Sequence, residues 1–481
     1  MNVILIQPPT NKAIQENYVS LQIPINLAYI AASLEQKRAN ITVIDYCVQE
    51  FNKKKLITQL EQLKPKIIGF TSLTASIHLV NEISQIIKKH DKKIITILGG
   101  PHATALPKQT LEELKAIDII VQGEGEKTIQ ELYTCIKTRK PLKTIKGIVF
   151  RRNKKIITNP KRKLIHDINK IVFPARHYFN EREYKRNHVS RGFSRKHLRI
   201  AEIITSRGCP GKCIFCAGHV NYGNRIRFRS FENIKQEIYE LKQKYKINHI
   251  TIEDDTFTIN HELVKKIGKY LKQNNITWNC NTRVNTVNLE LLQHMQKCGC
   301  KKVVFGVESG SEKILKIIRK GITLTQIRNA FKWAKQAKIR YVEGTFILGN
   351  HPQETVKDIE ETKKLIFELM PDFLCLTIMC PFPGTPVYEI MQKQKLLPRK
   401  PDWSKFTFIN NQPSYKKLEH VNSQTLIRIQ NQTLKKYYTS PKYVIQQIRK
   451  IRKPYEIMYF SKLAIEFTKK FLMRETGFEP A

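Results

Sequence analysis

Three cysteines lie within a short run of this chain, in the stretch Ser206-Arg207-Gly208-Cys209-Pro210-Gly211-Lys212-Cys213-Ile214-Phe215-Cys216. Thiolates spaced in this way, in a turn that contains glycine and proline, can converge on one soft metal centre such as zinc or an iron–sulfur cluster. Three ligands leave one coordination position of the centre open, and a substrate or cofactor can bind there. The loop therefore predicts a reactive metal centre with Cys209, Cys213 and Cys216 as its ligands.

Two simpler interpretations of the same loop stay open. His219 follows Cys216 by three positions and would complete a Cys3His zinc site, which would make the loop a structural staple. Cysteines can also be small apolar fillers of a core. The density of thiols in a turn disfavours the second interpretation.

The length of 481 residues is more than one domain usually needs and indicates two or three domains. The ten cysteines are mostly scattered and no signal peptide precedes them, so we expect a reducing, cytoplasmic environment. No apolar run reaches the roughly 18 to 20 residues that span a bilayer. We expect a soluble protein, and peripheral membrane contact stays open.

The formal net charge of +43 raises the question of a nucleic-acid partner. The basic residues are spread over the whole chain and are densest in predicted linker and tail regions, namely Arg151 to Lys163, Arg182 to Arg199 and Lys435 to Lys453. This distribution favours a solvated surface, and nucleic acid is not the expected partner. A basic nucleic-acid-binding protein with a zinc-stapled loop remains the alternative outside enzymes.

Residues 1–145 alternate short β-branched runs with amphipathic stretches. Strands are expected at Val3 to Ile6, Ile41 to Asp45, Ile67 to Thr71, Ile94 to Leu98 and Asp118 to Val121. Helices are expected at Asn26 to Gln36, His78 to Lys89 and Glu126 to Lys137. The pattern predicts an α/β domain with a doubly wound, Rossmann-like parallel sheet, whose ligands bind beyond the carboxyl ends of the strands.

Two glycine-containing turns fall at that edge of the predicted sheet. They are Gly99-Gly100-Pro101-His102-Ala103-Thr104 and Gly123-Glu124-Gly125-Glu126. Glycine lets a backbone pass close to a ligand, but neither turn is a G-x-G-x-x-G or Walker A motif. Residues 146–195 are expected to form a linker with a small hairpin at Gly147 to Thr158.

Residues 196–411 alternate again and predict six strand–helix units, a partial (β/α)6 barrel related to the TIM barrel. Strands are expected at Ile200 to Thr205, His249 to Glu253, Thr277 to Asn281, Lys302 to Val307, Tyr341 to Leu348 and Phe373 to Ile378. Helices are expected at Phe231 to Tyr245, Glu262 to Gln273, Leu289 to Lys297, Ser311 to Ile318, Thr325 to Ala337 and Thr355 to Leu369. Residues 412–481 form a helical C-terminal region in this prediction, with residues 474–481 left unassigned.

Polar residues and glycines follow the barrel strands, at the mouth where a barrel of this kind does its chemistry. The cysteine loop follows the first strand, and the later ends carry Glu253 to Phe257, Gly306 to Ser311, Gly344 and Gly349 with His351 to Glu354, and Pro381 to Thr385. Asp254 and Asp255 are equally well explained as caps of a following helix or as ligand contacts.

The cysteine loop, with Phe215 just before the third cysteine, and this order of strand ends resemble the radical S-adenosylmethionine (SAM) enzymes. The resemblance covers roughly residues 195–440. It implies a 4Fe-4S cluster on the three cysteines, whose unique iron SAM chelates. It further implies SAM contacts from Phe215, Asp254, Asp255, Glu308, Ser309, Gly344 and Gly349.

The front of the chain resembles the cobalamin (B12)-binding domain of one radical SAM subclass, over roughly residues 1–140. The residues that carry the likeness are Ile6-Gln7-Pro8-Pro9, the Thr71-Ser72 strand end and the two glycine turns. The resemblance implies cobalamin contacts from Ser72, Gly99, Gly100, His102, Gly123, Glu124 and Gly125. The Asp-x-His-x-x-Gly stretch that supplies a cobalt ligand in other cobalamin proteins is missing, so the lower face of the cobalt is unligated or its ligand is unidentified.

The two resemblances together imply an enzyme that cleaves SAM reductively to a 5'-deoxyadenosyl radical, with a reductase, flavodoxin or ferredoxin as electron donor. The favoured reaction is methylation of an unactivated carbon, or of phosphorus, in a small metabolite or lipid-like substrate. Cobalamin-linked cyclisation or oxidative rearrangement is the alternative. Radical modification of RNA is disfavoured because only Cys47 and Cys135, and no second triplet, precede the linker.

Overall fold

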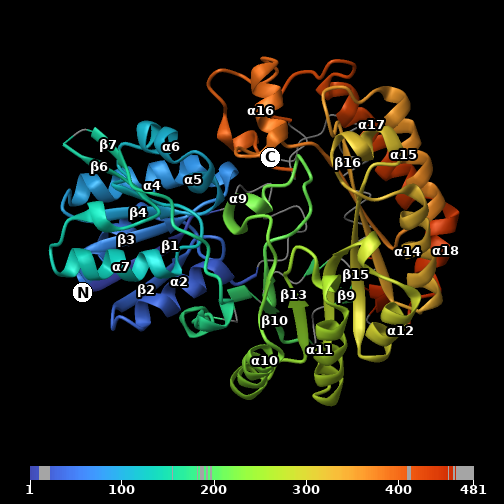
Figure 1. Cartoon of the computed structure of the whole chain (residues 1–481), viewed down its shortest axis with the longest axis horizontal. Coiled ribbons are helices and arrows are strands. Elements are labelled where there is room, and N and C mark those ends of the chain that lie inside the picture. The colour runs from blue at the N-terminus through green and yellow to red at the C-terminus, as the bar shows by residue number, and fades with distance from the viewer. Residues whose placement is uncertain are drawn as a thin grey trace.

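The structure is a computed structural model. It describes residues 1–9, 22–153, 155–180, 183–184, 189–190, 193–194, 198–408, 413–452, 454, 456–458 and 461. Two separate sheets dominate it, and Figure 1 shows the amino-terminal sheet in blue beside the second sheet in green to orange.

The amino-terminal sheet has seven strands in the order β2-β1-β3-β4-β5-β6-β7. The strands are β1 (Asn2–Gln7), β2 (Asn40–Asp45), β3 (Ile67–Thr71), β4 (Ile95–Gly99), β5 (Ile119–Val121), β6 (Ile148–Arg152) and β7 (Lys155–Thr158). The first five run parallel, as predicted, and β6 and β7 add an antiparallel hairpin at one edge. The hairpin expected inside the linker is thus paired with this sheet through β5, and the domain boundary at residue 145 stays a prediction.

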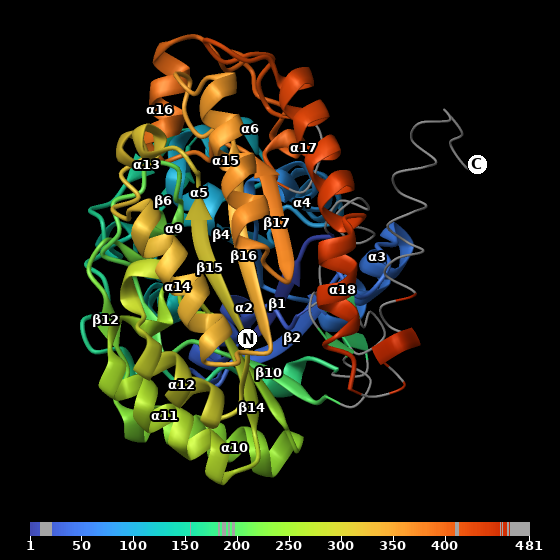
Figure 2. The ribbon, with the colours of Figure 1, turned by 90° about the vertical axis from the view of Figure 1, so that its right-hand side faces the viewer.

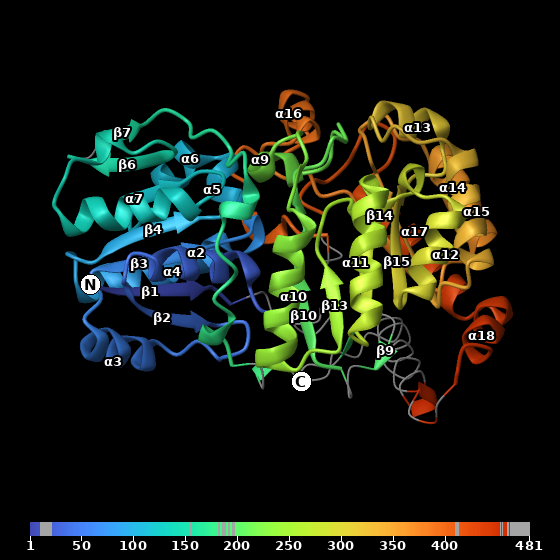
Figure 3. The same ribbon diagram turned by 60° about the horizontal axis from the view of Figure 1, so that its bottom comes forward.

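Helices cover both faces of this sheet because successive side chains of a strand point to opposite sides. Ile4 and Ile6 pack in one hydrophobic cluster, and Val3 and Leu5 pack in another. The helices are α2 (Ile25–Glu35), α3 (Lys53–Leu63), α4 (Ile77–His90), α5 (Pro101–Ala105), α6 (Pro107–Glu113) and α7 (Glu126–Lys137). Figure 3 looks toward the face of this sheet that α2 and α7 cover. The doubly wound fold is confirmed, and α3, α5 and α6 are helices that the sequence pattern had not predicted.

The second sheet has six parallel strands in sequence order. They are β10 (Ile200–Ile203), β13 (His249–Ile252), β14 (Thr277–Arg283), β15 (Cys300–Glu308), β16 (Tyr341–Leu348) and β17 (Phe373–Ile378). The helices between them, on the outer side in Figure 2, are α10 (Phe231–Tyr245), α11 (His261–Gln273), α12 (Leu289–Lys297), α13 (Glu312–Ile317), α14 (Leu324–Gln336) and α15 (Val356–Leu369). Every predicted strand and helix of the partial barrel is present within a few residues.

Capping side chains explain where several barrel helices begin. Ser230, Asn260 and Asn288 each accept a hydrogen bond from a backbone N–H in the first turn of the helix that follows. Thr323 and Thr355 form reciprocal capping boxes with the third helical residue. Such caps satisfy donors that the helix leaves unpaired, so each strand-to-helix turn is specified locally.

The C-terminal region covers the last barrel strand. After the short helix α16 (Pro386–Lys393), which follows β17, its helices are α17 (Ser423–Tyr438) and α18 (Pro441–Ile448), and both lie beside β17 in Figure 2. Gln430 donates to the carbonyl of Leu376 on β17 at 2.8 Å. The edge of an open sheet is thereby blocked, which removes a site for unwanted strand pairing.

Residues 474–481 lie outside the described residues. Within the described residues, no helix combines the length and the apolar character that crossing a membrane requires.

Candidate active site

The cysteine loop lies between β11 (Ser206–Arg207) and α9 (Gly218–Tyr222), beyond the carboxyl end of β10. Asp254, which follows β13, holds the start of this loop. Its carboxylate accepts hydrogen bonds from the backbone and hydroxyl of Thr205 at 2.6 and 2.5 Å and from the hydroxyl of Ser206 at 2.6 Å. Burial raises the pKa of Asp254, and these hydrogen bonds oppose the rise. Asp254 therefore orients the loop, and both of its oxygens are already used.

The three thiols are close enough to influence one another electrostatically. The pKa of Cys216 is raised to about 11, chiefly by burial, and the nearby Asp255, Cys213 and Cys209 contribute to this rise. The sulfur of Cys209 lies 3.5 Å from the hydroxyl of Thr256. The loop backbone is anchored where Ile214 N–H donates to the carbonyl of Ile318 at 3.1 Å. A metal centre that binds here must displace the thiol protons.

The donor set fits an iron–sulfur cluster better than a single ion. Among the described residues, no three side chains of His, Cys, Asp or Glu are grouped closely enough to hold one metal ion. A cluster is larger than one ion and accepts thiolates that lie farther apart. Three thiols on one anchored loop match that requirement.

Glu308 ends β15 with a φ of +72°, a conformation that residues other than glycine rarely adopt. Its carboxylate forms a buried ion pair with Lys320 at 2.7 Å. The Lys320 ammonium also lies 5.9 Å from the centre of the Phe215 ring. Two of the predicted SAM residues, Glu308 and Phe215, are thus joined through Lys320 beside the cysteine loop.

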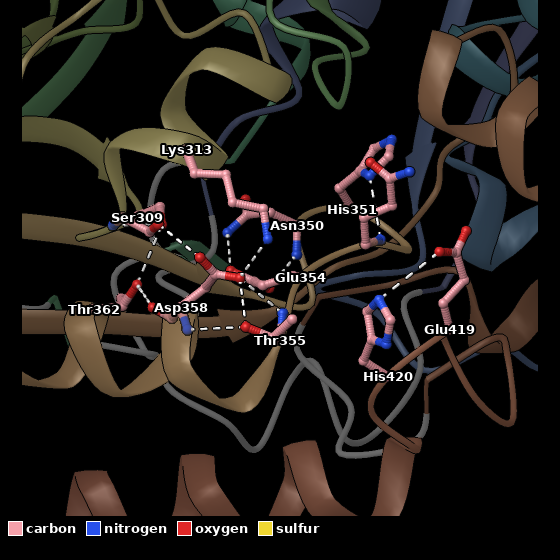
Figure 4. A network of polar contacts seen from close by, with 12 residues as sticks. Ser309, Lys313, Asn350, His351, Glu354, Thr355, Asp358, Thr362, Glu419 and His420 are labelled. Atoms are coloured by element: carbon pink, nitrogen blue, oxygen red, sulfur yellow. Dashed lines mark hydrogen bonds and ion pairs between the residues drawn. The ribbon is translucent and has the colours of Figure 1, made fainter.

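Figure 4 shows a polar network that includes Asn350 and Glu354, and this network contacts the backbone of Glu308. Asn350 donates from its side chain to the carbonyl of Glu308 at 3.3 Å, and its backbone N–H donates to Glu354 at 2.7 Å. Burial raises the pKa of Glu354 to about 7. Glu354 and Asn350 are both fully buried. Glu354 holds Asn350, and Asn350 in turn holds the backbone of Glu308 in its unusual conformation at the end of β15.

Three other predicted SAM residues face away from this ion pair. The Ser309 hydroxyl lies 3.2 Å from that of Thr362 and accepts from the N–H of Ser311. A side chain at Gly344 would contact Phe331 and Pro371, and one at Gly349 would contact Leu426 and Tyr415. These contacts are with the surrounding fold. SAM contact by these three residues, as by Asp255, stays a prediction.

The amino-terminal sheet carries a cleft at the carboxyl ends of its strands, next to α2 and α7. It encloses about 840 Å³ of empty space, including the part open to solvent. Its lining includes five of the predicted cobalamin residues, namely Gly99, Gly100, Gly123, Glu124 and Gly125. Gly69 also lines it, where an added Cβ would lie 2.8 Å from Leu5.

The cleft fits the polar tail of a large cofactor. Asn221 Oδ1 and Glu126 Oε2 are buried there and have no hydrogen-bond partner in the described part of the chain. Buried polar atoms of this kind normally have partners, so they are available to a bound ligand. Glycine backbones beside them allow close approach.

The two remaining predicted cobalamin residues lie outside the cleft lining. The backbone of Ser72 packs against Gly100. A Cβ atom added at Gly100 would lie 2.6 Å from the carbonyl oxygen of Ser72. His102 is 1% exposed and packs edge-on against Trp403, with ring centres 4.9 Å apart. Burial lowers the pKa of His102 to about 4, so the ring is neutral.

Arg207, on β11 and two positions before Cys209, connects the start of the cysteine loop to the cleft of the amino-terminal domain. Its guanidinium pairs with Glu124 at 3.0 Å and with Glu126 at 2.6 Å, and Arg227 pairs with Glu124 at 2.9 Å. The arginine lies between the rings of Tyr29 and Tyr222, at 5.1 and 5.3 Å. Glu124, expected as a cobalamin contact, is thus engaged in a buried ion-pair network between the cleft and the cysteine loop.

Four residues at the site were not predicted from the sequence, namely Arg207, Lys320, Asn350 and Asn221. Arg207 stands in the quoted cysteine run, and a basic residue next to a metal loop is a signal that could have been weighed. Lys320 and Asn221 carry no local pattern, because only the tertiary fold brings them to the site.

Residues 203–366 match the family model of the Radical SAM superfamily, and residues 12–133 match that of the B12 binding domain. The "Uncharacterized methyltransferase PH0819" of Pyrococcus horikoshii is 32% identical over 93% of this chain and 95% of its own length. The "Anaerobic magnesium-protoporphyrin IX monomethyl ester cyclase" of Cereibacter sphaeroides is 27% identical over 80% of this chain, which spans 62% of that protein.

Solved structures share the fold at low identity. The cobalamin-dependent SAM radical enzyme OxsB, solved with aqua-cobalamin and SAM, aligns with a TM-score of 0.73 and 18% identity over 98% of this chain and 72% of its own. The radical SAM methyltransferase TsrM of Kitasatospora setae, solved with cobalamin and a [4Fe-4S] cluster, aligns with a TM-score of 0.66 and 18% identity over 82% of this chain and 75% of its own.

A B12-binding domain in front of a radical SAM barrel defines the class of protein, a cobalamin-dependent radical SAM enzyme. The chain belongs to this family, as the relative from Pyrococcus horikoshii shows over nearly its whole length. The predicted family, fold class, enzyme class and cofactor set of 4Fe-4S cluster, SAM and cobalamin are confirmed. The individual site residues and the domain limits at 196–411 and 412–481 remain predictions.

Proposed function

We propose that this enzyme transfers a methyl group from SAM, by way of cobalamin, to an unactivated carbon or a phosphorus of a small metabolite or lipid-like molecule. The observation that carries the proposal is the position of Arg207. It ends the strand before the cysteine loop and pairs with Glu124 and Glu126, which line the amino-terminal cleft. Cofactors bound at the two places would be held next to each other.

In this proposal Cys209, Cys213 and Cys216 hold a 4Fe-4S cluster. Held there, and reduced by one electron from a flavodoxin, ferredoxin or reductase, a cluster would supply the electron that cleaves a carbon–sulfur bond of SAM to give methionine and a 5'-deoxyadenosyl radical. Lys320 holds the Glu308 carboxylate toward Phe215, and Asn350 fixes its backbone. These residues keep the SAM pocket ordered and exclude water, which a radical intermediate requires.

Gly99, Gly100, Gly123 and Gly125 let the cobalamin tail approach the strands, and Asn221 and Glu126 offer polar atoms to it. Bound cobalamin would supply a cobalt able to carry a methyl group from a second SAM, which would leave S-adenosylhomocysteine. The hydrogen that the methyl group replaces on the substrate would be taken up by the 5'-deoxyadenosyl radical and leave as 5'-deoxyadenosine. The name of the Pyrococcus horikoshii relative favours methyl transfer. The Cereibacter sphaeroides relative keeps ring formation as the second candidate.

The test uses the full chain, reconstituted without oxygen and supplied with cobalamin and SAM. We expect a brown protein with iron, sulfide and corrinoid absorbance that forms 5'-deoxyadenosine. Cys213→Ala should abolish its formation, whereas Cys380→Ala, at a buried cysteine outside the loop, should retain it. Unaltered 5'-deoxyadenosine from Cys213→Ala would overturn the cluster assignment. Mass analysis of products from methyl-labelled SAM separates methyl transfer from ring formation.

A further inference from the structure

Arg283 is the last residue of β14 and lies at the barrel mouth beside the cysteine loop. Its Nη1 donates to the sulfur of Cys213 at 3.6 Å, within hydrogen-bond range for sulfur. Its Nη2 donates to the carbonyl of Lys320, and its Nε donates to Asn285 at 3.3 Å. Partners on three nitrogens fix the plane of the guanidinium, so its approach to Cys213 is specified by the fold.

The loop leaves room for this guanidinium at Gly211. A Cβ built on Gly211 would lie 3.1 Å from Arg283 Nη1 and 3.4 Å from the sulfur of Cys209. Any other residue at position 211 would press on the arginine. The position of the Arg283 guanidinium therefore depends on the absence of a side chain at Gly211.

Arg283 differs from the nearby cations Lys320 and Arg207 in its partners. Lys320 is paired with Glu308, and Arg207 is paired with Glu124 and Glu126. In the part of the chain that the structure describes, Arg283 forms no ion pair with a carboxylate, and its charged N–H instead faces a cysteine sulfur. The positive charge is thus directed at the ligand loop.

We propose that Arg283 is a positioning residue that donates a hydrogen bond to the Cys213 thiolate and raises the reduction potential of the cluster. The inference rests on the proposed function, since it takes the three cysteines as ligands of a 4Fe-4S cluster. Reduction adds one negative charge to the cluster, and both an N–H···S bond and a nearby positive charge stabilise the reduced form. Partners of metal ligands tune metal sites in this way.

The test is a potentiometric titration, followed by electron paramagnetic resonance, of the reconstituted full-length protein. Arg283→Gln should shift the midpoint potential of the cluster to more negative values than in the wild type. Arg283→Lys keeps the charge but loses the planar fork, so its potential should lie between the two. Arg328→Gln, which removes an exposed arginine paired with Glu368, is the control and should leave the potential unchanged.

Gly211→Ala gives a second, independent perturbation, because it leaves the arginine in place but pushes it from the loop. It should shift the potential in the same direction as Arg283→Gln, by a smaller amount. In the double variant the two shifts should not add, because once Arg283 is absent the methyl group has nothing to displace. If Arg283→Gln fails to retain iron, the midpoint potentials of Arg283→Lys and Gly211→Ala test the proposal instead. An unchanged potential in both variants would overturn it.

An unchanged potential in Arg283→Gln with full iron and sulfide content would overturn the role of Arg283 and leave the proposed function standing. A shift of equal size in Arg328→Gln would also overturn it, since the effect would then be one of net charge. A wild-type protein that binds no cluster would instead remove the proposed function, and this inference with it.

Discussion

Arg207 Nη2 donates to Glu126 Oε1 at 2.6 Å, and this contact joins the strand that leads into the cysteine loop to the first residue of α7, a helix that packs on the amino-terminal sheet. The arginine is 4% exposed, and the side chain of Glu124, its other partner, is 2% exposed. Ionic groups taken out of water in this way depend on their partners. The two halves of the active site are therefore held by a contact that tolerates little change.

Arg207→Met should lower the free energy of unfolding by about 3 to 5 kcal/mol, the usual cost of leaving buried charges without their partner. It should also weaken cobalamin retention, because Glu124 and Glu126 line the cleft. Chemical denaturation and corrinoid absorbance after gel filtration measure the two effects.

The matched control is Arg328→Met. Arg328 pairs with Glu368 at 2.6 Å, but both side chains are about half exposed, at 47% and 48%. An exposed pair contributes roughly 0 to 1 kcal/mol. Equal losses in the two variants would show that burial of the Arg207 network does not matter.

Gly69→Val should abolish cobalamin binding and leave the iron content intact. Gly69 lines the cleft, and its added side chain would occupy the space beside Leu5. Overpacking itself costs about 1 to 3 kcal/mol, which a control must match. Gly268→Val in α11, where a Cβ would lie 3.1 Å from Cys298, overpacks the barrel away from the cleft. Loss of corrinoid absorbance in both variants would contradict the assignment of the cleft.

The sequence predicted the fold well because its signals are local. The capped start of α10 and the buried run of β16, for example, follow directly from Ser230 and from Tyr341 to Leu348. The hairpin of β6 and β7 was recognised but assigned to the linker, since strand pairing across a sheet leaves no mark in the hairpin itself. Pairing partners are set by tertiary structure.

The candidate site was predictable only where one segment supplies it. The three cysteines share one loop, and the glycines of the cleft share two turns. By contrast, Lys320 lies after α13 and contacts Glu308 at the end of β15. Arg283 lies at the end of β14 and contacts Cys213 in the cysteine loop. Glu124, whose cobalamin contact the family resemblance implied, shows another gap: its ion pairs with the distant Arg207 and Arg227 leave no mark in the turn, and its contact with cobalamin stays a prediction.

Glu354→Gln should change the pH dependence of stability. Burial raises the pKa of Glu354 from 4.5 to about 7, so the folded protein binds a proton that the unfolded chain releases between these pH values. The wild type therefore loses about 3 kcal/mol, at roughly 1.4 kcal/mol per pKa unit, as the pH rises from 4.5 to 7. Gln mimics the neutral acid and should remove this loss, as measured by urea denaturation across the range. An identical pH profile in the two proteins would contradict the raised pKa.

His102→Asn should change the pH dependence in the opposite sense. Burial against Trp403 lowers the pKa of His102 from 6.5 to about 4, so between these values the unfolded chain binds a proton that the folded protein excludes. This group therefore takes about 3 kcal/mol from the wild type as the pH falls from 6.5 to 4, and below pH 4 the cost stays constant. The Asn variant should not show this loss, so its stability relative to wild type should rise on acidification, whereas that of Glu354→Gln should fall. Because the two variants diverge in sign over the same pH range, each serves as the control for the other, and parallel profiles would mean that the burial of neither side chain governs its titration.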